Sequence, residues 1–336
     1  MSFATGGERS NPLIRLEDVS LTYREASTFF GAPRNVYAVD GVTLDIYPQE
    51  VATLAGESGC GKTTLGKVIV ALLKPTAGRI LYKDKDLWSL TGSEWRTCRR
   101  SLQIIHQDPY QALNPSKTIF NILSAPIRYH KLVKGRDEAR ERVEELLRTV
   151  GLRPEEIVEK YPHQLSGGQR QRVVVARAVS LNPELVVADE PVSMIDVSLR
   201  IDMLDLLLDL KQRFRMSSIF ITHDLGLARY YAREGRLVIM YLGNIVEVGP
   251  TEDVIQKPLH PYTKSLLSVV PIPDPKLVRE RKAMELRSLD IPSASNPPSG
   301  CKFHPRCPFA LERCSKERPG LVEAGDNRLV ACFLVE

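Results

Sequence analysis

The sequence predicts an α/β fold, and the evidence is three short apolar runs that each lead into polar residues. The stretch Gly56-Glu57-Ser58-Gly59-Cys60-Gly61-Lys62-Thr63-Thr64 lies between an apolar run at 51–55 and a run at 65–73 with helical spacing. Two further apolar runs, at 185–188 and 218–221, precede titratable residues. Such runs predict buried strands of a parallel sheet, whose carboxyl ends gather polar residues at one edge.

The glycine-rich stretch at 56–64 matches the phosphate-loop pattern G-x-x-x-x-G-K-[ST] in full. Its glycines allow backbone N–H groups to turn towards a phosphate, and the following helix adds its positive N-terminal end. We expect Lys62 to reach the β- and γ-phosphates of a nucleoside triphosphate, and the Thr63 hydroxyl to ligate Mg²⁺. A glycine-rich turn can also be purely structural, but the strand before it and the helix after it favour nucleotide binding.

A small antiparallel sheet is expected before this loop. Residues 14–23 alternate apolar and polar side chains as a half-buried strand does, and Tyr23 closes the run. Residues 37–39 and 42–46 are expected as two more strands, joined by a turn at Asp40-Gly41. Tyr23 could stack on an adenine ring at the end of this sheet, and packing in the core is the alternative.

The middle of the chain predicts further helices and a strand. We expect a basic helix at 95–102, a strand at 103–105 shortly before Gln107, and an amphipathic helix at 135–150 that ends at Gly151. The last helix carries two expected i,i+4 ion pairs, Glu138 with Arg142 and Glu144 with Arg148. Taken alone, Gln107 indicates only a solvated glutamine at the end of a strand.

A second glycine-containing stretch, Leu165-Ser166-Gly167-Gly168-Gln169, precedes a run at 173–180 with helical spacing. Ser166 and the two glycines would stand at a helix N-terminus, where backbone N–H groups and the helix dipole favour an anion. A helix that begins with two glycines can be merely structural. If this one binds an anion, the chain contains two anion sites.

Two apolar runs end in residues suited to phosphate chemistry. One leads into Asp189 and Glu190, the arrangement that holds Mg²⁺ and activates water in phosphate-loop ATPases. Two adjacent carboxylates after a buried strand are costly without such a role. The run at 218–222 ends in His223, and ligands collect at the carboxyl ends of strands in open α/β sheets. Further along, Gly243-Asn244 is expected as a two-residue hairpin turn.

In chain order these features closely resemble the ATP-binding cassette ATPases over about residues 14–250. The features are the phosphate loop, Gln107, the signature at 165–169, Asp189-Glu190, Asp196 and His223. The signature is the most specific of them, because it separates this family from other phosphate-loop proteins. The resemblance implies an α/β phosphate-loop NTPase with a RecA-like core, an antiparallel β subdomain, and an inserted helical subdomain at about 108–180.

The resemblance also implies a role for each site residue. ATP and Mg²⁺ would lie in a head-to-tail dimer, between the phosphate loop of one cassette and Ser166-Gly167-Gly168 of the other. Tyr23 would stack on adenine, and His223 would contact the γ-phosphate. Gln107 would contact Mg²⁺ and sense the membrane partner, and Asp189 would hold Mg²⁺ through water. Glu190 would act as the general base. The implied nucleotide-binding residues are Tyr23, Gly56, Glu57, Ser58, Gly59, Cys60, Gly61, Lys62, Thr63, Thr64, Gln107, Ser166, Gly167, Gly168, Gln169, Asp189, Glu190, Asp196 and His223.

One stretch departs from the pattern of the family. The chain has Ser193-Met194-Ile195-Asp196 where the family usually has Ser-Ala-Leu-Asp. The aspartate is kept, but larger residues enter the loop that would cross the dimer interface. We therefore expect a different packing of this loop.

The C-terminal part resembles the extension of the oligopeptide and dipeptide importer ATPases, through residues 259–264 and 291–301. We expect a nucleotide-binding domain at 1–250 and the extension at 251–336, with dense prolines between Pro271 and Pro298. The implied function is ATP hydrolysis that powers an importer, most closely one for dipeptides or oligopeptides. The implied partners are a second cassette, copy or paralogue, two membrane permeases and, indirectly, an extracytoplasmic binding protein.

Three other functions compete with peptide import. A soluble cassette ATPase of DNA repair or translation would carry long coiled-coil insertions or two cassettes, whereas about 100 residues separate Lys62 from Ser166 and only one cassette is present. A non-hydrolysing binding module would lack Glu190 or His223, and both are present. Importers of oligosaccharides or metal chelates stay open, since the substrate is chosen by other subunits.

Composition places the protein in the cytosol. The polar N-terminus has no apolar signal region, and no apolar run reaches the roughly 18 residues of a membrane span. The net charge of +5 is spread along the chain, which does not favour nucleic-acid binding. We expect a peripheral protein on the cytoplasmic face of the inner membrane.

Four of the six cysteines, Cys301, Cys307, Cys314 and Cys332, lie close together near the C-terminus. Disulfides are disfavoured in the cytosol. Four buried free thiols without a metal are the alternative to a metal site. Zinc sites usually take closely spaced cysteine pairs, which are lacking here, whereas wider spacing is easier to reconcile with an iron–sulfur cluster. Resemblance to the peptide-importer ATPases implies a 4Fe-4S cluster with a structural role, and Zn²⁺ is the alternative.

Overall fold

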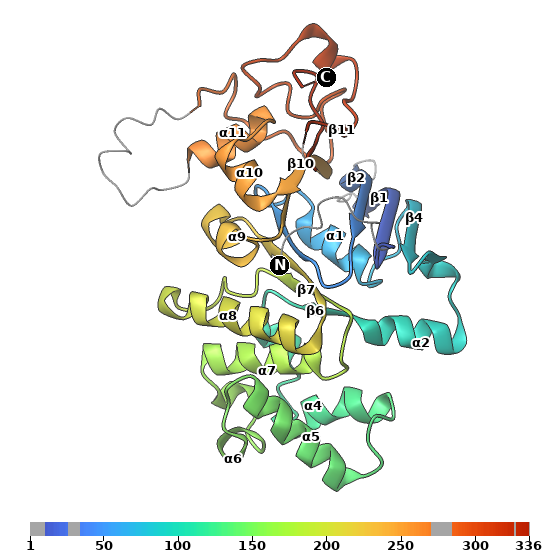
Figure 1. Cartoon of the computed structure of the whole chain (residues 1–336), viewed down its shortest axis with the longest axis vertical. Helices are drawn as coiled ribbons and strands as arrows, with labels where there is room; N and C mark the ends of the chain where they lie inside the picture. Colours follow the sequence, from blue (N-terminus) through green and yellow to red (C-terminus); the bar gives the residue numbers. More distant parts are fainter. Residues whose placement is uncertain (1–10, 26–33, 270–283, 326, 336) are drawn as a thin grey trace, which may run out of the picture. The chain divides into compact units, whose positions relative to one another are not determined.

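The computed structural model describes residues 11–25, 34–269, 284–325 and 327–335, which belong to two compact units (Figure 1). Unit 1 comprises Met1–Ile46, Val51–Trp88 and Thr222–Glu336, and unit 2 comprises Tyr47–Glu50 and Ser89–Ile221. The expectation for the N-terminus at residues 1–10, and that for the proline-dense stretch at 270–283, lie outside the described residues.

The expected antiparallel sheet forms in unit 1 in the order β2-β1-β4-β5. Its strands are β1 Ile14–Glu25, β2 Arg34–Ile46, β4 Ala77–Tyr82 and β5 Lys85–Asp86. Because β2 is continuous, the expected turn at Asp40-Gly41 is wrong. Gly41 has a φ of 61°, and its N–H donates to the Ser20 hydroxyl over 2.8 Å. The pairing of β1 with β2 shifts register here, so these residues form a bulge.

A second set of strands in unit 1 begins with β3, which leads into the phosphate loop. β3 Val51–Ala55 pairs in parallel with β9 Arg236–Tyr241, followed by β10 Asn244–Pro250, β12 Leu329–Val330 and β11 Val322–Glu323 in antiparallel pairs. Asn244 pairs with Tyr241, so the hairpin turn is Leu242-Gly243, one residue earlier than expected. These two residues have φ of 42° and 79°, as a tight primed turn requires.

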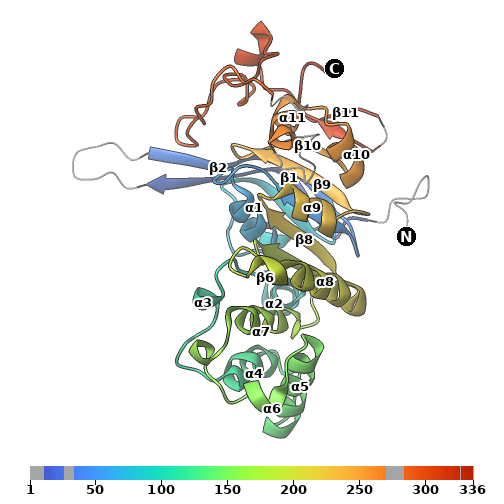
Figure 2. The same cartoon turned by 90° about the vertical axis from the view of Figure 1, so that its left-hand side faces the viewer.

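The helices of unit 1 are α1 Lys62–Ile69, α9 Leu225–Tyr231, α10 Thr251–Gln256 and α11 Pro261–Ser268. The last three pack on this second set of strands, and α1 contacts β2. Figure 2 shows α10 and α11 beside β10. One buried cluster joins residues of β9, β10, α9, α10 and α11 to Phe303 and Cys307. These two residues belong to the C-terminal segment, residues 284–325 and 327–335. The C-terminal segment therefore shares the core of unit 1.

Unit 2 holds a parallel group of strands and most of the longer helices. β6 Leu102–Ile105, β7 Leu185–Asp189 and β8 Ser217–Thr222 pair in parallel in this order. The helices are α2 Gly92–Ser101, α3 Pro109–Ala112, α4 Ile119–Tyr129, α5 Arg136–Thr149, α6 Pro154–Ile157, α7 Gly167–Val179 and α8 Val197–Phe214. Short 3₁₀ turns lie at Leu87–Ser89, Pro162–Gln164 and Glu312–Ser315.

The amphipathic helix α5 follows the expected pattern with one exception. It ends before Gly151, which has a φ of 70°, and Glu144 lies 3.2 Å from Arg148. The expected pair of Glu138 with Arg142 is wrong, because Arg142 contacts Glu145 three positions later at 2.7 Å. Glu138 instead accepts the Lys134 backbone N–H over 2.6 Å, before the first turn of the helix. A backbone donor without a helical partner thus uses the carboxylate.

Candidate nucleotide site and C-terminal segment

The expected phosphate loop joins β3 to α1 in unit 1. Gly56, Gly59 and Gly61 have φ of 154°, 76° and 104°, which residues with side chains rarely adopt. A Cβ on Gly56 would lie 2.2 Å from the Met240 carbonyl oxygen, and a Cβ on Gly61 would lie 2.0 Å from that of Ala38. Backbone conformation and space therefore both require glycine at these two positions.

Lys62 is buried and lies across this loop. Its ammonium donates to the carbonyl oxygens of Gly56 over 2.9 Å and Glu57 over 2.8 Å, and lies 3.7 Å from the Cys60 sulfur. Helix α1 begins at Lys62, so Thr63 stands in its first turn, where backbone N–H groups favour an anion. A cation and a helix N-terminus thus meet at the loop, as a phosphate site requires.

Glu57 is held by two residues that the sequence did not single out for the site. Its backbone N–H donates to the Tyr262 hydroxyl over 2.9 Å. Its carboxylate accepts from the Arg306 guanidinium over 2.9 to 3.1 Å. Tyr262 lies in the C-terminal motif at 259–264, and Arg306 directly precedes Cys307 of the four clustered cysteines. No local pattern links either position to the phosphate loop.

The acidic strand end in unit 2 brings two expected site residues together. The Gln107 side-chain amide donates to the Glu190 carboxylate over 2.9 Å. Glu190 follows β7 with a φ of 43°, and its backbone N–H donates to Ile221 over 3.0 Å. A left-handed conformation is unusual for glutamate and often marks a functional position. Asp189 is buried, with 3% of the residue exposed.

The signature forms the capped start of α7. The Ser166 hydroxyl accepts the Gln169 backbone N–H over 3.3 Å, and the Gln169 side chain accepts that of Ser166 over 3.1 Å. The reciprocal pair is a capping box. Ser166 and Gly167 are exposed, so the first turn of α7 is accessible in unit 2.

The unusual loop before Asp196 lies next to the signature. A Cβ on Gly167 would lie 3.9 Å from the Met194 carbonyl oxygen. Met194 is 59% exposed whereas Ile195 is 6% exposed. The two larger residues therefore have different environments, because Ile195 packs inside unit 2 and Met194 faces outward.

The remaining site residues are exposed and divided between the units. Tyr23 is 41% exposed and lies opposite Val36 of β2, and His223 follows β8. Unit 1 holds Tyr23, residues 56–64 and His223, and unit 2 holds Gln107, 166–169, Asp189, Glu190 and Asp196. Tyr23 lies within β1, whereas the other site residues lie at or just after the carboxyl end of a strand, or at the start of a helix.

The four C-terminal cysteines line one small cavity, together with residues such as Phe303 and Phe333. Burial is the main cause that raises the pKa of the Cys301 thiol to about 11, and the other three cysteines contribute to this rise. No group of three or more His, Cys, Asp or Glu side chains that could hold a metal ion occurs among the described residues. The cysteines are thus gathered, but the expected metal site is not assembled.

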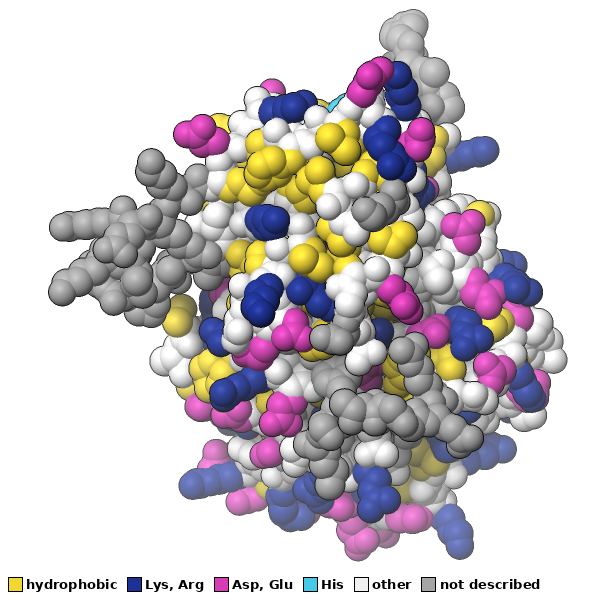
Figure 3. Space-filling model, turned by 45° about the horizontal axis from the view of Figure 1, so that its top comes forward, with side chains coloured by type: hydrophobic (Ala, Val, Ile, Leu, Met, Phe, Trp, Pro, Cys, Tyr) yellow, Lys and Arg dark blue, Asp and Glu magenta, His cyan; other side chains and the backbone are white. Residues whose placement is uncertain are grey.

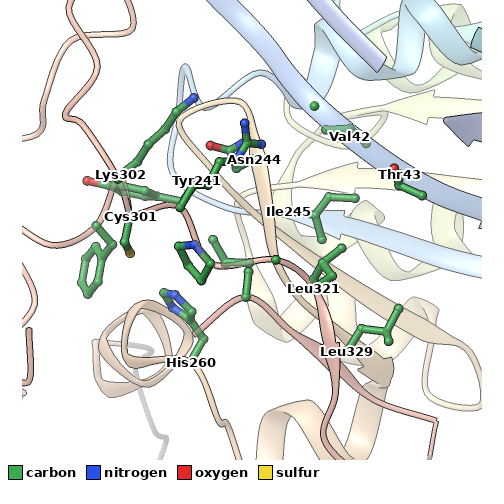
Figure 4. A pocket seen from close by; sticks show the side chains of 18 of the residues that line it. Val42, Thr43, Tyr241, Asn244, Ile245, His260, Cys301, Lys302, Leu321 and Leu329 are labelled. Carbon is green, nitrogen blue, oxygen red and sulfur yellow. The ribbon is translucent and has the colours of Figure 1, made fainter. Parts of the chain in front are cut away.

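A larger cavity of about 590 Å³ lies between the strands of unit 1 and its C-terminal segment (Figure 4). Thr43, Ile245 and Leu329 line one side, and His260 and Cys301 another. Beside the cavity, Lys302 donates to Asp40 over 2.7 Å and to the Leu242 carbonyl oxygen over 2.7 Å. These contacts fasten the C-terminal segment to β2 and to the β9–β10 turn.

The C-terminal segment also carries exposed apolar side chains, and Figure 3 shows apolar side chains gathered on the face that it forms. The large ones in this segment, each 45% exposed or more, are Leu289, Ile291, Phe309, Leu311 and Leu334. Within the described ranges, no helix is both long and apolar enough to cross a membrane.

Two family matches cover most of the chain. The ABC transporter family matches residues 39–193. The family described as oligopeptide/dipeptide transporter, C-terminal region, matches residues 246–314.

Curated relatives match nearly the whole chain. The oligopeptide transport ATP-binding protein OppF of Salmonella typhimurium is 41% identical, over 98% of this chain and 98% of that protein. YkfD of Bacillus subtilis, a putative oligopeptide transport ATP-binding protein, is 45% identical over 97% of this chain and 96% of its own. The dipeptide transport ATP-binding protein DppF of Haemophilus influenzae is 40% identical, with 98% of each chain covered.

Solved structures of ATP-binding cassettes resemble the chain over most of its length. A dimeric cassette, MJ0796, in a post-hydrolysis state bound to ADP and Pi is 28% identical with a TM-score of 0.62, and covers 71% of this chain and 98% of its own. The cassette cbiO1 from Clostridium perfringens is 25% identical with a TM-score of 0.61, over 74% of this chain and 92% of its own.

Proposed function

The chain belongs to the ATP-binding proteins of the oligopeptide and dipeptide ABC transporters, and on this premise we propose that it hydrolyses ATP to power peptide import. One observation carries the proposal, namely that relatives named for oligopeptide or dipeptide transport are 40 to 45% identical over nearly their whole length. The match of residues 246–314 to the C-terminal region of oligopeptide/dipeptide transporters supports the proposal. A soluble cassette ATPase of DNA repair or translation would not be expected to contain this region.

ATP and Mg²⁺ are the cofactors that fit this family, and we assign the nucleotide to the loop at 56–64. Lys62 neutralises the β- and γ-phosphates, and Thr63 is a Mg²⁺ ligand together with Gln107 and Asp189. The support is that the Lys62 ammonium is buried at the start of α1. In the contacts described above, its partners are two backbone carbonyl oxygens and a thiol, and none of them is a carboxylate. Tyr23 is the proposed stacking partner of adenine.

We assign the general base to Glu190. Its carboxylate lies 2.9 Å from Gln107, which would orient it, and its backbone is held in a left-handed conformation. His223 contacts the γ-phosphate in this proposal, and Ser166-Gly167-Gly168 completes the site of a second cassette, as its exposed helix start supports. Catalysis then consists of positioning and charge stabilisation, with proton removal from the attacking water at Glu190.

The proposed organisation keeps a nucleotide-binding domain at 1–250, with a helical subdomain at about 108–180, and an extension at 251–336. The helices from α3 to α7 occupy the proposed subdomain. The proposed partners are a second cassette, two membrane permeases and, indirectly, an extracytoplasmic binding protein. The protein would then be peripheral on the cytoplasmic face of the inner membrane.

We further propose that Cys301, Cys307, Cys314 and Cys332 hold a structural 4Fe-4S cluster. The support is that all four thiols line one cavity. Their spacing along the chain suits a cubane cluster better than a single Zn²⁺, because zinc sites usually take closely spaced cysteine pairs. Bound there, the cluster would crosslink four points of the C-terminal segment.

The function is tested by affinity purification of the tagged chain from its native membranes. Co-purification of two permeases and a paralogous or identical cassette, with ATP hydrolysis stimulated by a peptide-loaded binding protein, is the expected result. If an oligosaccharide or a metal chelate stimulated hydrolysis and peptides did not, the proposal of peptide import would be wrong, and that compound would be the substrate. A chain that purifies without membrane subunits would favour the soluble ATPase.

A further inference from the structure

Glu57, the second residue of the phosphate loop, is held from two sides by the C-terminal part of unit 1. Its backbone N–H donates to the Tyr262 hydroxyl, and its carboxylate lies in the fork of the Arg306 guanidinium. Three N–O distances in this fork lie between 2.9 and 3.1 Å. A bidentate pair fixes direction as well as distance, so it restrains the Glu57 side chain strongly.

Arg306 itself has little freedom to leave this position. Its side chain is 7% exposed, its backbone N–H donates to Phe303 over 3.0 Å, and its carbonyl accepts the Arg287 N–H over 3.1 Å. The guanidinium lies 5.8 Å from the centre of the Tyr241 ring. Burial lowers the pKa of Arg306, but its hydrogen bonds to Glu57 and Tyr241 more than offset this, and the pKa is raised overall.

The aromatic rings around this pair connect it to the strand before the loop. Tyr241, Tyr262 and Phe303 have ring centres 4.6 to 5.4 Å apart, and none is more than 1% exposed. They belong to the same buried cluster as Ala55, the last residue of β3. The residues that anchor Glu57 and the strand that leads into the loop thus share one close-packed core.

The ion pair compensates for the burial of the Arg306 charge. The Nε of Arg306 is buried, and among the described residues it has no hydrogen-bond partner. Removal of one member of a buried pair leaves the other charge uncompensated, which is costly. Glu57 and Arg306 are therefore expected to act as a unit, and a change at either should move the loop backbone to which Lys62 donates.

We propose that Arg306 is a positioning residue for the phosphate loop, which sets the backbone path of Gly56 and Glu57 by holding the Glu57 carboxylate. The inference rests on the proposed role of this loop in ATP binding. Its consequence is that a residue of the C-terminal segment tunes the affinity for the phosphates of ATP, although it does not touch them. Arg306 directly precedes Cys307, so the loop that anchors Glu57 also carries one of the four cysteines.

The alternative is that Arg306 only fastens the C-terminal segment to unit 1. Arg328 provides the matched comparison, because it is 7% exposed and pairs with the fully buried Glu247 of β10, whereas none of its described hydrogen bonds or ion pairs is with the phosphate loop. Loss of either arginine should destabilise the fold. Only loss of Arg306 should change nucleotide affinity.

The test is a double-mutant cycle on the full-length chain with Arg306→Gln and Glu57→Gln. Each single variant should have a Kd for ATP about tenfold higher than wild type, which corresponds to about 1.4 kcal/mol. The Kd of the double variant should not exceed the larger of the two single-variant values. In the assembled transporter, KM for ATP should rise while kcat at saturating ATP changes much less. An unchanged Kd in Arg306→Gln, or losses that multiply in the double variant, would overturn the proposal.

Three controls separate the explanations. Arg328→Gln should keep the wild-type Kd, and an equal loss there would assign the effect to general destabilisation and refute positioning. Arg306→Lys keeps the charge but not the fork, so its Kd should lie between wild type and Arg306→Gln, and a wild-type Kd would count against the proposal. If Lys62→Ala also bound ATP normally, the nucleotide site itself would be wrong, which differs from a failure at Arg306 alone.

Discussion

The side-chain amide of Gln107 donates to the Glu190 carboxylate over 2.9 Å, just beyond the ends of the paired strands β6 and β7. This contact links a residue assigned to Mg²⁺ and partner sensing with the proposed general base. A shift of Gln107 would therefore change the orientation of the base directly.

Glu190→Gln should abolish turnover and leave ATP binding intact. The substitution keeps the size of the side chain and removes the base, which costs about 10²-fold or more in rate, whereas the phosphate loop is unchanged. ATP should then trap a closed dimer, visible as a doubled mass in size-exclusion chromatography with light scattering. Glu159→Gln, an exposed acid of unit 2, serves as the control, and normal hydrolysis by Glu190→Gln would remove the assigned role.

Lys62→Ala should weaken ATP binding itself. The ammonium is the main positive charge at the loop, so we expect the Kd for ATP to rise at least about tenfold, or 1.4 kcal/mol. Equilibrium titration with a fluorescent ATP analogue measures this. Lys67→Ala, later in the same helix, should bind as wild type does. Undiminished affinity in Lys62→Ala would exclude the assignment.

Local patterns were sufficient to predict most of the candidate site. The phosphate loop, the signature and Asp189-Glu190 each depend on neighbours in the chain, such as an apolar strand before or a helix after. The turn at Asp40-Gly41 was misplaced for the same reason, because a positive-φ glycine marks a bulge as well as a turn. Arg306 could not be found this way, since its partner Glu57 lies 249 positions earlier.

Protonation of His260 should destabilise the protein at mildly acidic pH. Burial is the main cause that lowers the pKa of His260 from 6.5 to about 3, a hydrogen bond to Ala331 opposes it, and Lys264 adds to it. The unfolded chain therefore takes up a proton that the native state does not, so stability is full above about pH 6.5 and falls towards pH 3. Between pH 7 and 5 the expected loss is about 2 kcal/mol.

The measurement for this prediction is urea unfolding at pH 7 and pH 5, in wild type and in His260→Asn. Asparagine can accept the Tyr262 N–H at the start of α11 as His260 does, but it does not titrate. The carboxylate of Glu247, which accepts the His260 N–H over 3.0 Å, stays in place in both proteins. An equal pH-dependent loss in both would show that another group is responsible.

The segment from Asp108 to Tyr129 should dock on the membrane subunits. Tyr110 and Tyr129 are 65% and 74% exposed in unit 2, and exposed aromatic side chains are frequent anchors of interfaces. We expect Tyr110→Ala and Tyr129→Ala together to reduce co-purification with the permeases and coupled transport, without loss of ATP binding. Tyr230→Ala in unit 1 is the control. Unchanged co-purification would place the docking surface elsewhere.

Anaerobically purified protein should be brown, with broad absorption near about 400 nm from thiolate-to-iron charge transfer. Cys307→Ser should remove this absorption, because one of four ligands is lost. Cys98→Ser, outside the C-terminal segment, should keep it. If the protein were colourless and contained stoichiometric zinc and no iron, the four cysteines would bind Zn²⁺ and the proposal of a 4Fe-4S cluster would be wrong.

The distance along the chain between Glu57 and Arg306 has a consequence for synthesis. Position 306 is reached 249 residues after position 57, which takes about 12 to 50 s at about 5–20 residues per second. During this time the nascent chain already carries the glycines and Lys62 of the phosphate loop, but the guanidinium that holds Glu57 does not yet exist. A chain interrupted between positions 64 and 306 therefore contains the phosphate loop without its anchor, so full affinity for ATP is expected only after position 306 has been added.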